Sequence, residues 1–275
     1  MANRFLVFLG HGIPAIAFIF WGLLLFLTNA ASRFRGHEKP GRLSLITKPA
    51  EFYILFLGSA GVITFHCILQ PTRSYPDLEH ISMAIPFMIY ALCLRSKLHL
   101  PSAFVSLMEA AAFAQELFLF HWHSTDHVGV EGHYHMLLQL IVTACMFSSL
   151  VEVFVPQNHN AMMIKFWKSI CIIFHGIWLL QLSLLLVFPA TFLPLGCQVF
   201  VRHHQKIECG SENLVNQSKA MGTLLFSWYL SLLMSKLVPN NGPDRKVVPN
   251  AGQNDAPSYN HSHWQTKFSR SPLLD

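Results

Sequence analysis

Five histidines lie within fifteen residues near the middle of the chain, and this is the segment where the sequence most clearly predicts chemistry. They are His121, His123, His127, His133 and His135. Imidazole binds transition metals, titrates near neutral pH and passes protons from group to group. We therefore expect a metal site or a proton path of this protein to involve this segment.

The spacing within this cluster limits what the imidazoles can share. On a regular helix, residues two apart point about 200° away from each other, so His121 and His123 do not reach one ion together. The same holds for His133 and His135. Either one member of each pair faces a site, or the pairs lie at helix ends, where this restriction relaxes. His123 and His127 have the spacing for a shared ion only in a helix, and the Ser, Thr, Asp and Gly residues around them indicate a loop instead.

Two carboxylates precede the cluster on what we expect to be one helix face. Glu109 and Glu116 are seven residues apart, and His123 follows seven residues later. Seven residues are close to two helical turns, so all three fall on nearly the same face. Such a stripe suits a metal site, a proton path or an internal hydrogen-bond ladder, and the last of these would be purely structural.

The composition indicates that these residues are held in a membrane. The chain is 52% hydrophobic and 12% charged, with a mean hydropathy of +0.40. Soluble domains carry about 25% charged residues. A bilayer dissolves the excess of apolar surface, so we expect an all-α, polytopic membrane helix bundle.

Seven apolar segments are near the length of about 20 residues that a helix needs to cross the hydrocarbon core. The third is the weakest, because Pro86 interrupts it, so six spans are the alternative. We expect a membrane domain over residues 1–237 and a disordered cytosolic tail over residues 238–275, which is rich in Pro, Asn, Gly and Ser. The segments are Phe5–Leu27, Phe52–Leu69, Leu78–Leu94, Pro101–Phe120, Met136–Val155, Ile164–Phe188 and Ala220–Leu237.

The basic residues predict the orientation of these spans. With seven spans, 14 of the 19 lysines and arginines fall on one side of the membrane. The positive-inside rule places that side in the cytoplasm. The N-terminus then faces the lumen or the exterior and the C-terminus is cytosolic, in an endomembrane or the plasma membrane.

The opposite side carries two further features. Cys197 and Cys209 lie in the loop before the last span, where an oxidising compartment permits either a disulfide or two free thiols. Asn216 begins an Asn-Gln-Ser glycosylation sequon on that side. By the same count, the histidine cluster, His11, His66 and His80 all lie toward the lumenal half of the membrane.

Six of these histidines are the candidate ligands of one lumenal metal or cofactor site. An imidazole shell favours zinc, copper or iron over a hard, oxygen-seeking ion. A lone histidine within a helix is more often a hydrogen-bonded interior residue, so the candidates depend on convergence. They are His11, His66, His121, His123, His133 and His135.

Two motifs carry a resemblance to a known family. The segment from Phe118 to Leu138, with Phe-Leu-Phe-His-Trp-His followed by Glu-Gly-His-Tyr-His-Met-Leu-Leu, resembles the signature of the transmembrane protein 45 family. Gly10-His11-Gly-Ile-Pro14 resembles the Gly-His-x-x-Pro-Gly of the same family, with Ala15 in place of the last glycine. The form of the histidine motif and Phe226-Ser-Trp-Tyr-Leu230 are similar to the plant branch, which includes virus-response-like proteins.

The resemblance covers most of residues 1–237 and implies a multi-pass membrane protein of seven helices, without an established biochemical activity. The two His-x-His pairs are further apart here than in animal members. For that reason, individual ligand roles are not carried over.

Three hypotheses for the function follow. In the first, a transition metal supports redox chemistry or lipid hydrolysis with Glu109 or Glu116 as the base, or a haem is bound between two imidazoles. In the second, the same groups form the relay of a proton-coupled transporter or channel. In the third, the protein is a non-catalytic membrane adaptor in stress or defence, and its tail recruits partners. We rank the first slightly ahead, because it explains why the histidines concentrate at one end.

Other classes are excluded by missing signatures. The sequence has no Gly-rich phosphate loop, no Gly-x-Ser-x-Gly and no His-Glu-x-x-His. The basic residues border the membrane rather than form a stripe for nucleic acid. The expected partners are membrane lipids and a lipid or small-molecule substrate.

Overall fold

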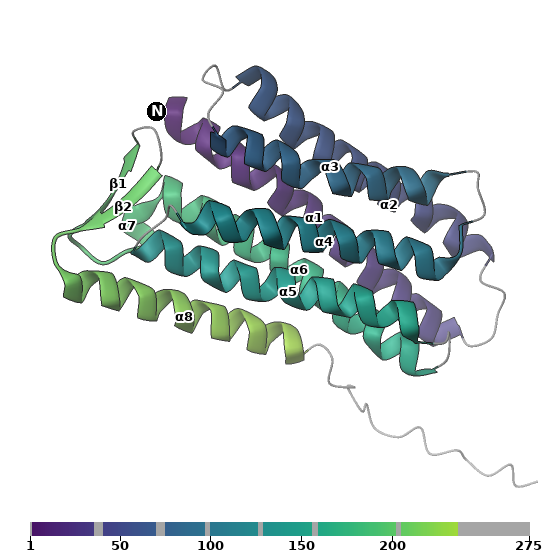
Figure 1. Cartoon of the computed structure of the whole chain (residues 1–275). Helices are drawn as coiled ribbons and strands as arrows, with labels where there is room; N and C mark the ends of the chain where they lie inside the picture. The colour runs from purple at the N-terminus through teal and green to yellow at the C-terminus, as the bar shows by residue number, and fades with distance from the viewer. Residues whose placement is uncertain are drawn as a thin grey trace, which may run out of the picture. The chain divides into compact units, whose positions relative to one another are not determined.

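The computed structural model describes residues 2–35, 41–69, 75–96, 100–125, 129–155, 159–201 and 205–235. The predicted disordered tail, residues 238–275, lies wholly outside the described residues, and so do His127 and the side chain of His123. The long helices run side by side, and a β-hairpin lies at one end of them (Figure 1). The elements in chain order are α1 (Ala2–Arg35), α2 (Gly41–Thr64) with a π-helical continuation (Phe65–Leu69), α3 (Tyr75–Arg95), α4 (Ser102–Thr125), α5 (Val130–Phe154), α6 (His159–Val187), α7 (Pro189–Phe192), β1 (Cys197–Val201), β2 (Gln205–Cys209) and α8 (Glu212–Ser235).

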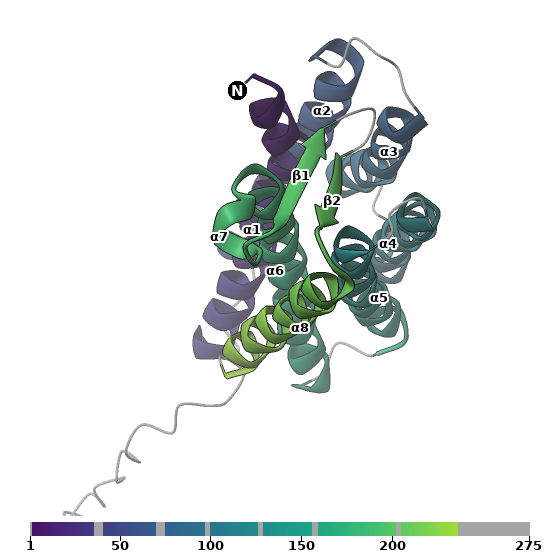
Figure 2. The same ribbon diagram turned by 90° about the vertical axis from the view of Figure 1, so that its left-hand side faces the viewer.

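The predicted all-α membrane bundle is confirmed. Within the described part of the chain, six helices are long and apolar enough to cross a membrane, namely α1 to α6. The predicted seventh span corresponds to α8, which is not among them. Its 24 residues suffice in length, but its first two turns hold polar residues from Glu212 to Lys219, which lower its hydropathy. The count of seven is therefore not confirmed, although α8 packs against α5 and α6 (Figures 1 and 2).

Helix α6 is the centre of the bundle. Within its apolar segment, 78% of the residues are buried, more than in any other candidate span of the described chain. Trp178 is completely buried on this helix and its Nε1 donates a hydrogen bond of 3.0 Å to the carbonyl oxygen of Tyr134 on α5. Residues of α6 therefore face inward from nearly every side, including those that carry charge.

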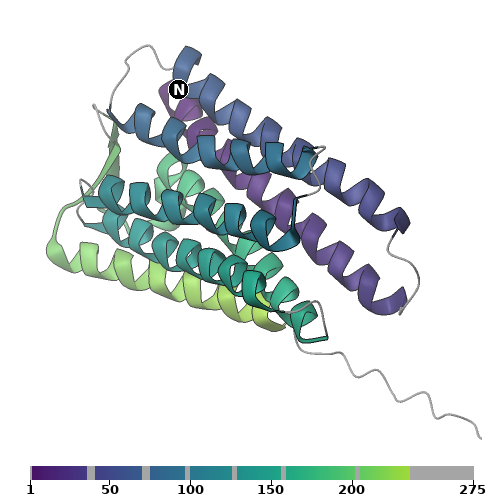
Figure 3. The same cartoon turned by 45° about the vertical axis from the view of Figure 1, so that its right-hand side comes forward.

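Two glycines bring α1 and α6 into close contact. A Cβ atom at Gly22 of α1 would lie 2.7 Å from the backbone nitrogen of Ile173, and one at Gly176 of α6 would lie 2.7 Å from the carbonyl oxygen of Ala15. Small residues allow membrane helices to approach backbone to backbone, where dispersion replaces the hydrophobic effect as the driving force. This contact holds α1 and α6 together along the axis of the bundle (Figure 3).

The β-hairpin follows the carboxyl end of α6. Its two strands are antiparallel, and their register places Cys197 opposite Cys209. A disulfide joins these two cysteines. Asn216 is exposed in the second turn of α8, close behind the hairpin. The features that the sequence analysis assigned to the lumenal side therefore lie together at one end.

Candidate functional site

A charged cavity lies at the end of the bundle where α4 and α6 begin, opposite the β-hairpin. Its volume is about 780 Å³, and each of the helices α1 to α6 contributes residues to its wall. Ligand pockets have volumes of about 300–1,000 Å³, so this cavity is large enough for a small organic molecule. Its charged lining residues are Lys48, Glu51, Glu109, Glu152, Lys165 and Lys168.

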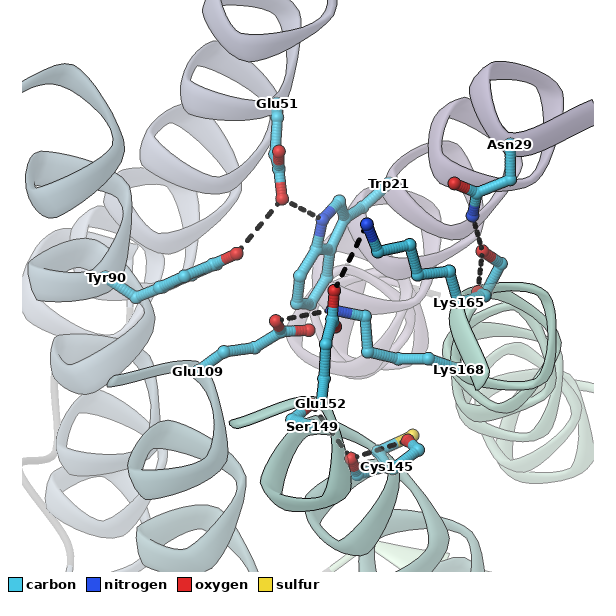
Figure 4. A network of polar contacts seen from close by, with 12 residues as sticks. Trp21, Asn29, Glu51, Tyr90, Glu109, Cys145, Ser149, Glu152, Lys165 and Lys168 are labelled. Atoms are coloured by element: carbon cyan, nitrogen blue, oxygen red, sulfur yellow. Dashed lines mark hydrogen bonds and ion pairs between the residues drawn. The ribbon is translucent and has the colours of Figure 1, made fainter. Parts of the chain in front are cut away.

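Lys168 is the centre of this charged cavity (Figure 4). Its Nζ lies 2.8 Å from Oε2 of Glu109 on α4 and donates a second hydrogen bond to Oε2 of Glu152 on α5. The side chains of Lys168 and Glu109 are only 9% and 2% exposed. Desolvating an ion pair costs more than the pair regains unless each charged atom is well satisfied. Ionisable residues inside a membrane bundle are costly, and they commonly mark functional sites.

One oxygen of this bridge lacks a partner. Oε1 of Glu109 is buried and accepts no hydrogen bond from any residue that the structure describes. Glu152 has a second contact, because its Oε1 lies 4.0 Å from Nζ of Lys165. The carboxylate of Glu109 therefore remains half satisfied at the wall of a polar cavity.

A third carboxylate, Glu51 of α2, is held by neutral donors. Its Oε1 accepts hydrogen bonds of 2.9 Å from Nε1 of Trp21 and 3.1 Å from the hydroxyl of Tyr90. Figure 4 shows Glu51, Tyr90 and Glu109 directed toward the same space. The inner part of the cavity thus holds three carboxylates and a single buried ammonium group, that of Lys168.

Four aromatic rings extend from Trp21, which donates to Glu51 of the charged cavity, to Phe18, which contacts His175, and we call them the aromatic layer. The rings of Trp21 and Phe113 are stacked with their centroids 5.8 Å apart, and Phe87 meets Phe113 edge-on at 5.2 Å. Phe18 completes the layer against Phe87 at 5.2 Å. All four side chains are buried. The layer contains no polar atom except Nε1 of Trp21, which points to the charged cavity.

A second ionisable pair lies beyond the aromatic layer. Nε2 of His175 on α6 lies 3.3 Å from Oε1 of Glu116 on α4, and both side chains are buried. The ring of Phe18 lies 4.1 Å from that of His175. Because Lys168 precedes His175 by the same seven residues that separate Glu109 from Glu116, the two pairs occupy successive levels of the same two helices.

Glu116 also lines a smaller cavity of about 70 Å³ together with His11 and His80. His80 stacks on His66 with ring centroids 4.7 Å apart, and His11 meets His80 edge-on at 5.7 Å. Nδ1 of His66 lies 2.9 Å from Oδ1 of Asp77. We call His11, His66, His80 and Asp77 the histidine–aspartate cluster. It brings together the predicted ligands His11 and His66, with two residues that were not among the predicted ligands.

The remaining predicted ligands are distributed among different neighbours. Nδ1 of His121 lies 3.4 Å from Oε1 of Gln139, and Nε2 of His133 lies 2.9 Å from the hydroxyl oxygen of Thr223 on α8. His135 is buried, with Nδ1 2.9 Å from the carbonyl oxygen of Glu131. The predicted divergence of His133 and His135 on a regular helix is what the structure shows.

Among the described residues, no group of three or more His, Cys, Asp and Glu side chains is arranged to hold a metal ion. The histidine–aspartate cluster illustrates the reason. The rings of His66 and His80 are stacked with an angle of 16° between their planes. Their lone pairs lie in nearly parallel planes and do not converge on one point.

Sequence reasoning did not predict the charged cavity. Neither Glu51 nor Glu152 was a candidate site residue, and Lys168 was counted only among the basic residues that predict the orientation. The available signal was the position of Lys168 inside the apolar segment Ile164–Phe188. A lysine there requires a carboxylate partner on a neighbouring helix.

The fold and the buried charges together define a multi-pass helical membrane protein with an ionisable interior. Comparison with protein families matches residues 102–239 to the family of unknown function DUF716, and the chain belongs to this family. A search of the curated proteins found no match.

Proposed function

We propose that this protein is a proton-coupled membrane transporter or channel. The observation that supports this most is a pair of cavities, each of which includes ionisable residues in its wall, with the aromatic layer between Glu109 and Glu116. Glu109 lines the charged cavity, Glu116 lines the small cavity, and Phe113 lies between these two residues on α4. Ionisable residues within membrane spans are costly and mark ion and proton pathways.

The ionisable groups are arranged as two half-paths. From one end, a proton reaches Glu109 and Lys168 through the charged cavity. From the other end, it reaches Glu116 and His175 past the histidine–aspartate cluster. The small cavity of about 70 Å³ has room for water between His80 and Glu116, because one ordered water needs only about 10–15 Å³ by this measure.

The gap between the half-paths is too long for a direct transfer. Glu109 and Glu116 are seven residues apart, which is about 10 Å along a helix. A hydrogen bond spans about 3 Å, and the aromatic layer fills the space. Passage of a proton therefore requires the aromatic layer to admit water or to move, and such a step couples proton flow to a change of shape.

The orientation of the path forms part of the proposal. With α8 as a seventh span, the positive-inside rule gives the charged cavity to the cytoplasmic side and the β-hairpin to the lumen or exterior. The disulfide between Cys197 and Cys209 fits an oxidising compartment. Insertion into microsomes tests this orientation. Asn216, or a sequon introduced at the hairpin, should gain a glycan, and Asn260, which begins an Asn-His-Ser sequon in the tail, should not.

Within the matched family, we propose that the chain belongs with the plant-type, virus-response-like branch of the transmembrane protein 45 family. The histidine motif from Phe118 to Leu138 lies entirely inside the residues that the family comparison matches. A tree built from many family sequences tests this placement, and grouping with the animal branch would contradict it.

Binding of zinc or another transition metal remains a second proposal, supported by the proximity of His11, His66 and His80. It requires one of the stacked rings to turn. Glu109 and Glu116 are engaged by Lys168 and His175, so this geometry does not favour them as hydrolytic bases. Elemental analysis of purified protein tests the proposal, and a metal-free protein after gentle purification would contradict it.

Proton flux into sealed vesicles tests the main proposal. The purified protein is reconstituted with a pH-sensitive dye inside, and an outward potassium gradient supplies the driving potential. We expect wild-type protein to acidify the vesicles and Glu116→Gln to reduce the rate at least about tenfold, because the amide neither binds nor releases a proton. Glu212→Gln, an exposed carboxylate at the start of α8, is the matched control and should retain the wild-type rate. Equal rates in all three proteins and in empty vesicles would contradict proton coupling.

A further inference from the structure

The charged cavity has more acceptors than donors in its inner part. Glu109 presents a buried Oε1 without a partner among the described residues, and its side chain is only 2% exposed. Among the described residues, the hydrogen-bond donors to Glu51 are the neutral groups of Trp21 and Tyr90. The ammonium of Lys168 already bridges Glu109 and Glu152. A ligand that enters this part of the cavity is therefore favoured if it brings a positive charge and N–H donors.

Tyr90 adds a second preference. Its hydroxyl binds Glu51 from a ring that lines the cavity between the two carboxylates. Aromatic faces attract ammonium groups and pack against the carbon atoms that carry them. The wall made by Glu51, Tyr90 and Glu109 thus combines two carboxyl acceptors with an aromatic ring.

The size of the cavity separates an organic ligand from a metal ion. A volume of about 780 Å³ far exceeds the space of a single ion and lies in the range of small-molecule sites. The two other lysines of the wall, Lys48 and Lys165, are more exposed than Lys168. These two lysines can bind an anionic group at the other end of a ligand whose ammonium group lies near Glu51 and Glu109.

We propose that the charged cavity binds a small organic ammonium compound, with its ammonium group between Glu51 and Glu109. An alkylamine and a zwitterion that carries an amine and a carboxylate share this chemistry. That this compound is the transported solute rests on the transport function proposed above. That it binds in the cavity is tested by binding measurements alone.

Thermal unfolding of the full-length protein in detergent, at constant ionic strength, tests the binding. The four probes are n-butylamine, 4-aminobutyrate, butyrate and n-butanol, which share a chain of four carbons and differ in charge. We expect the two amines to raise Tm by about 3 °C near saturation, and butyrate and butanol to leave it unchanged. A larger shift with 4-aminobutyrate than with butylamine identifies a zwitterion that also uses the lysines, whereas an equal or smaller shift identifies a plain amine. Either order supports the proposal.

The variant Glu51→Gln tests whether the amine binds in the charged cavity. It leaves the Lys168 bridge intact, and its amide oxygen still accepts from Trp21 and Tyr90, so the fold is retained. We expect the amine-dependent shift to fall by at least about half, with Glu212→Gln behaving as wild type. No shift with either amine, an equal shift with butanol, or an unchanged shift in Glu51→Gln would overturn the proposal. Amine binding without proton flux would contradict the proposed transport alone, and proton flux without amine binding would contradict this inference alone.

Discussion

The histidine motif and the charged cavity differ in whether residues that are close in the sequence are also close in the fold. At the histidine end, residues that are neighbours in the sequence have different neighbours in space. His133 contacts Thr223 of α8, whereas His135 is buried and its ring packs against Phe120 of α4. At the charged cavity, residues that are far apart in the sequence meet, since Lys168 contacts Glu109 from 59 positions away. A dense motif is therefore a weaker guide to a buried site than a single charge inside an apolar span.

Replacement of Lys168 should have the largest effect and tests whether the charged cavity is a built site. Lys168→Met leaves Glu109 and Glu152 buried without their cation, which we expect to cost about 3–5 kcal/mol of stability. The measurement is the midpoint of thermal unfolding in detergent, together with the yield of monodisperse protein. The double variant Lys168→Met/Glu109→Gln should recover part of the loss. A single variant as stable as wild type would show that the bridge does not hold the helices.

The next effect concerns the neutral donors to Glu51. Trp21→Phe keeps a ring in the aromatic layer but removes the donor from Glu51, and we expect a loss of about 2 kcal/mol. Tyr90→Phe removes the other donor to the same oxygen and should cost a similar amount. Unfolding midpoints measure both. Losses that add fully in the double variant would contradict a shared acceptor, because the second removal should cost more than the first.

The sequence predicted the helices well and the charged cavity poorly, for one physical reason. The thickness of a bilayer sets the length of an apolar span, so local composition located each of α1 to α6. The ends are less accurate, since α2 begins at Gly41 and the predicted segment began at Phe52. The Glu109 and Glu116 stripe followed from helical periodicity alone, and both side chains are indeed buried.

The residues that contact Glu109 and Glu116 could not be predicted from helical periodicity. The contact of Glu109 with Lys168 depends on which helices are neighbours, and no local pattern encodes this. The short strands β1 and β2 were not predicted either. The last predicted segment began at Ala220, whereas α8 begins at Glu212, because the first two turns of this helix are polar.

The histidine–aspartate cluster should show a smaller effect than the charged cavity. Asp77→Ala removes the acceptor beside Nδ1 of His66, which is buried, and we expect a loss of about 1–2 kcal/mol. Asp77→Asn retains an acceptor oxygen and should lose less. Unfolding midpoints in detergent compare the two variants. A loss above that of Lys168→Met would reverse the ranking of the two ends.

The smallest effect is expected within the histidine motif itself. His133→Ala removes one hydrogen bond to Thr223 at a partly exposed position, so we expect about 0.5 kcal/mol or less. Thr223→Val is the matched partner variant and should behave alike. If His133→Ala instead abolished proton flux without changing the unfolding midpoint, the motif would have a functional role that its contacts do not show.

Proton leak through a variant of the aromatic layer tests the central claim most directly. Phe113→Ala removes the fully buried ring between Glu109 and Glu116 and opens a space that water can enter. Phe113→Leu takes its place if the alanine variant does not fold. In reconstituted vesicles, we expect the variant to conduct protons at least about tenfold faster than wild type, and Phe113→Ala/Glu116→Gln to return to the background rate. A rate unchanged by Phe113→Ala, or a leak that persists without Glu116, would contradict a path of two compartments separated by the aromatic layer.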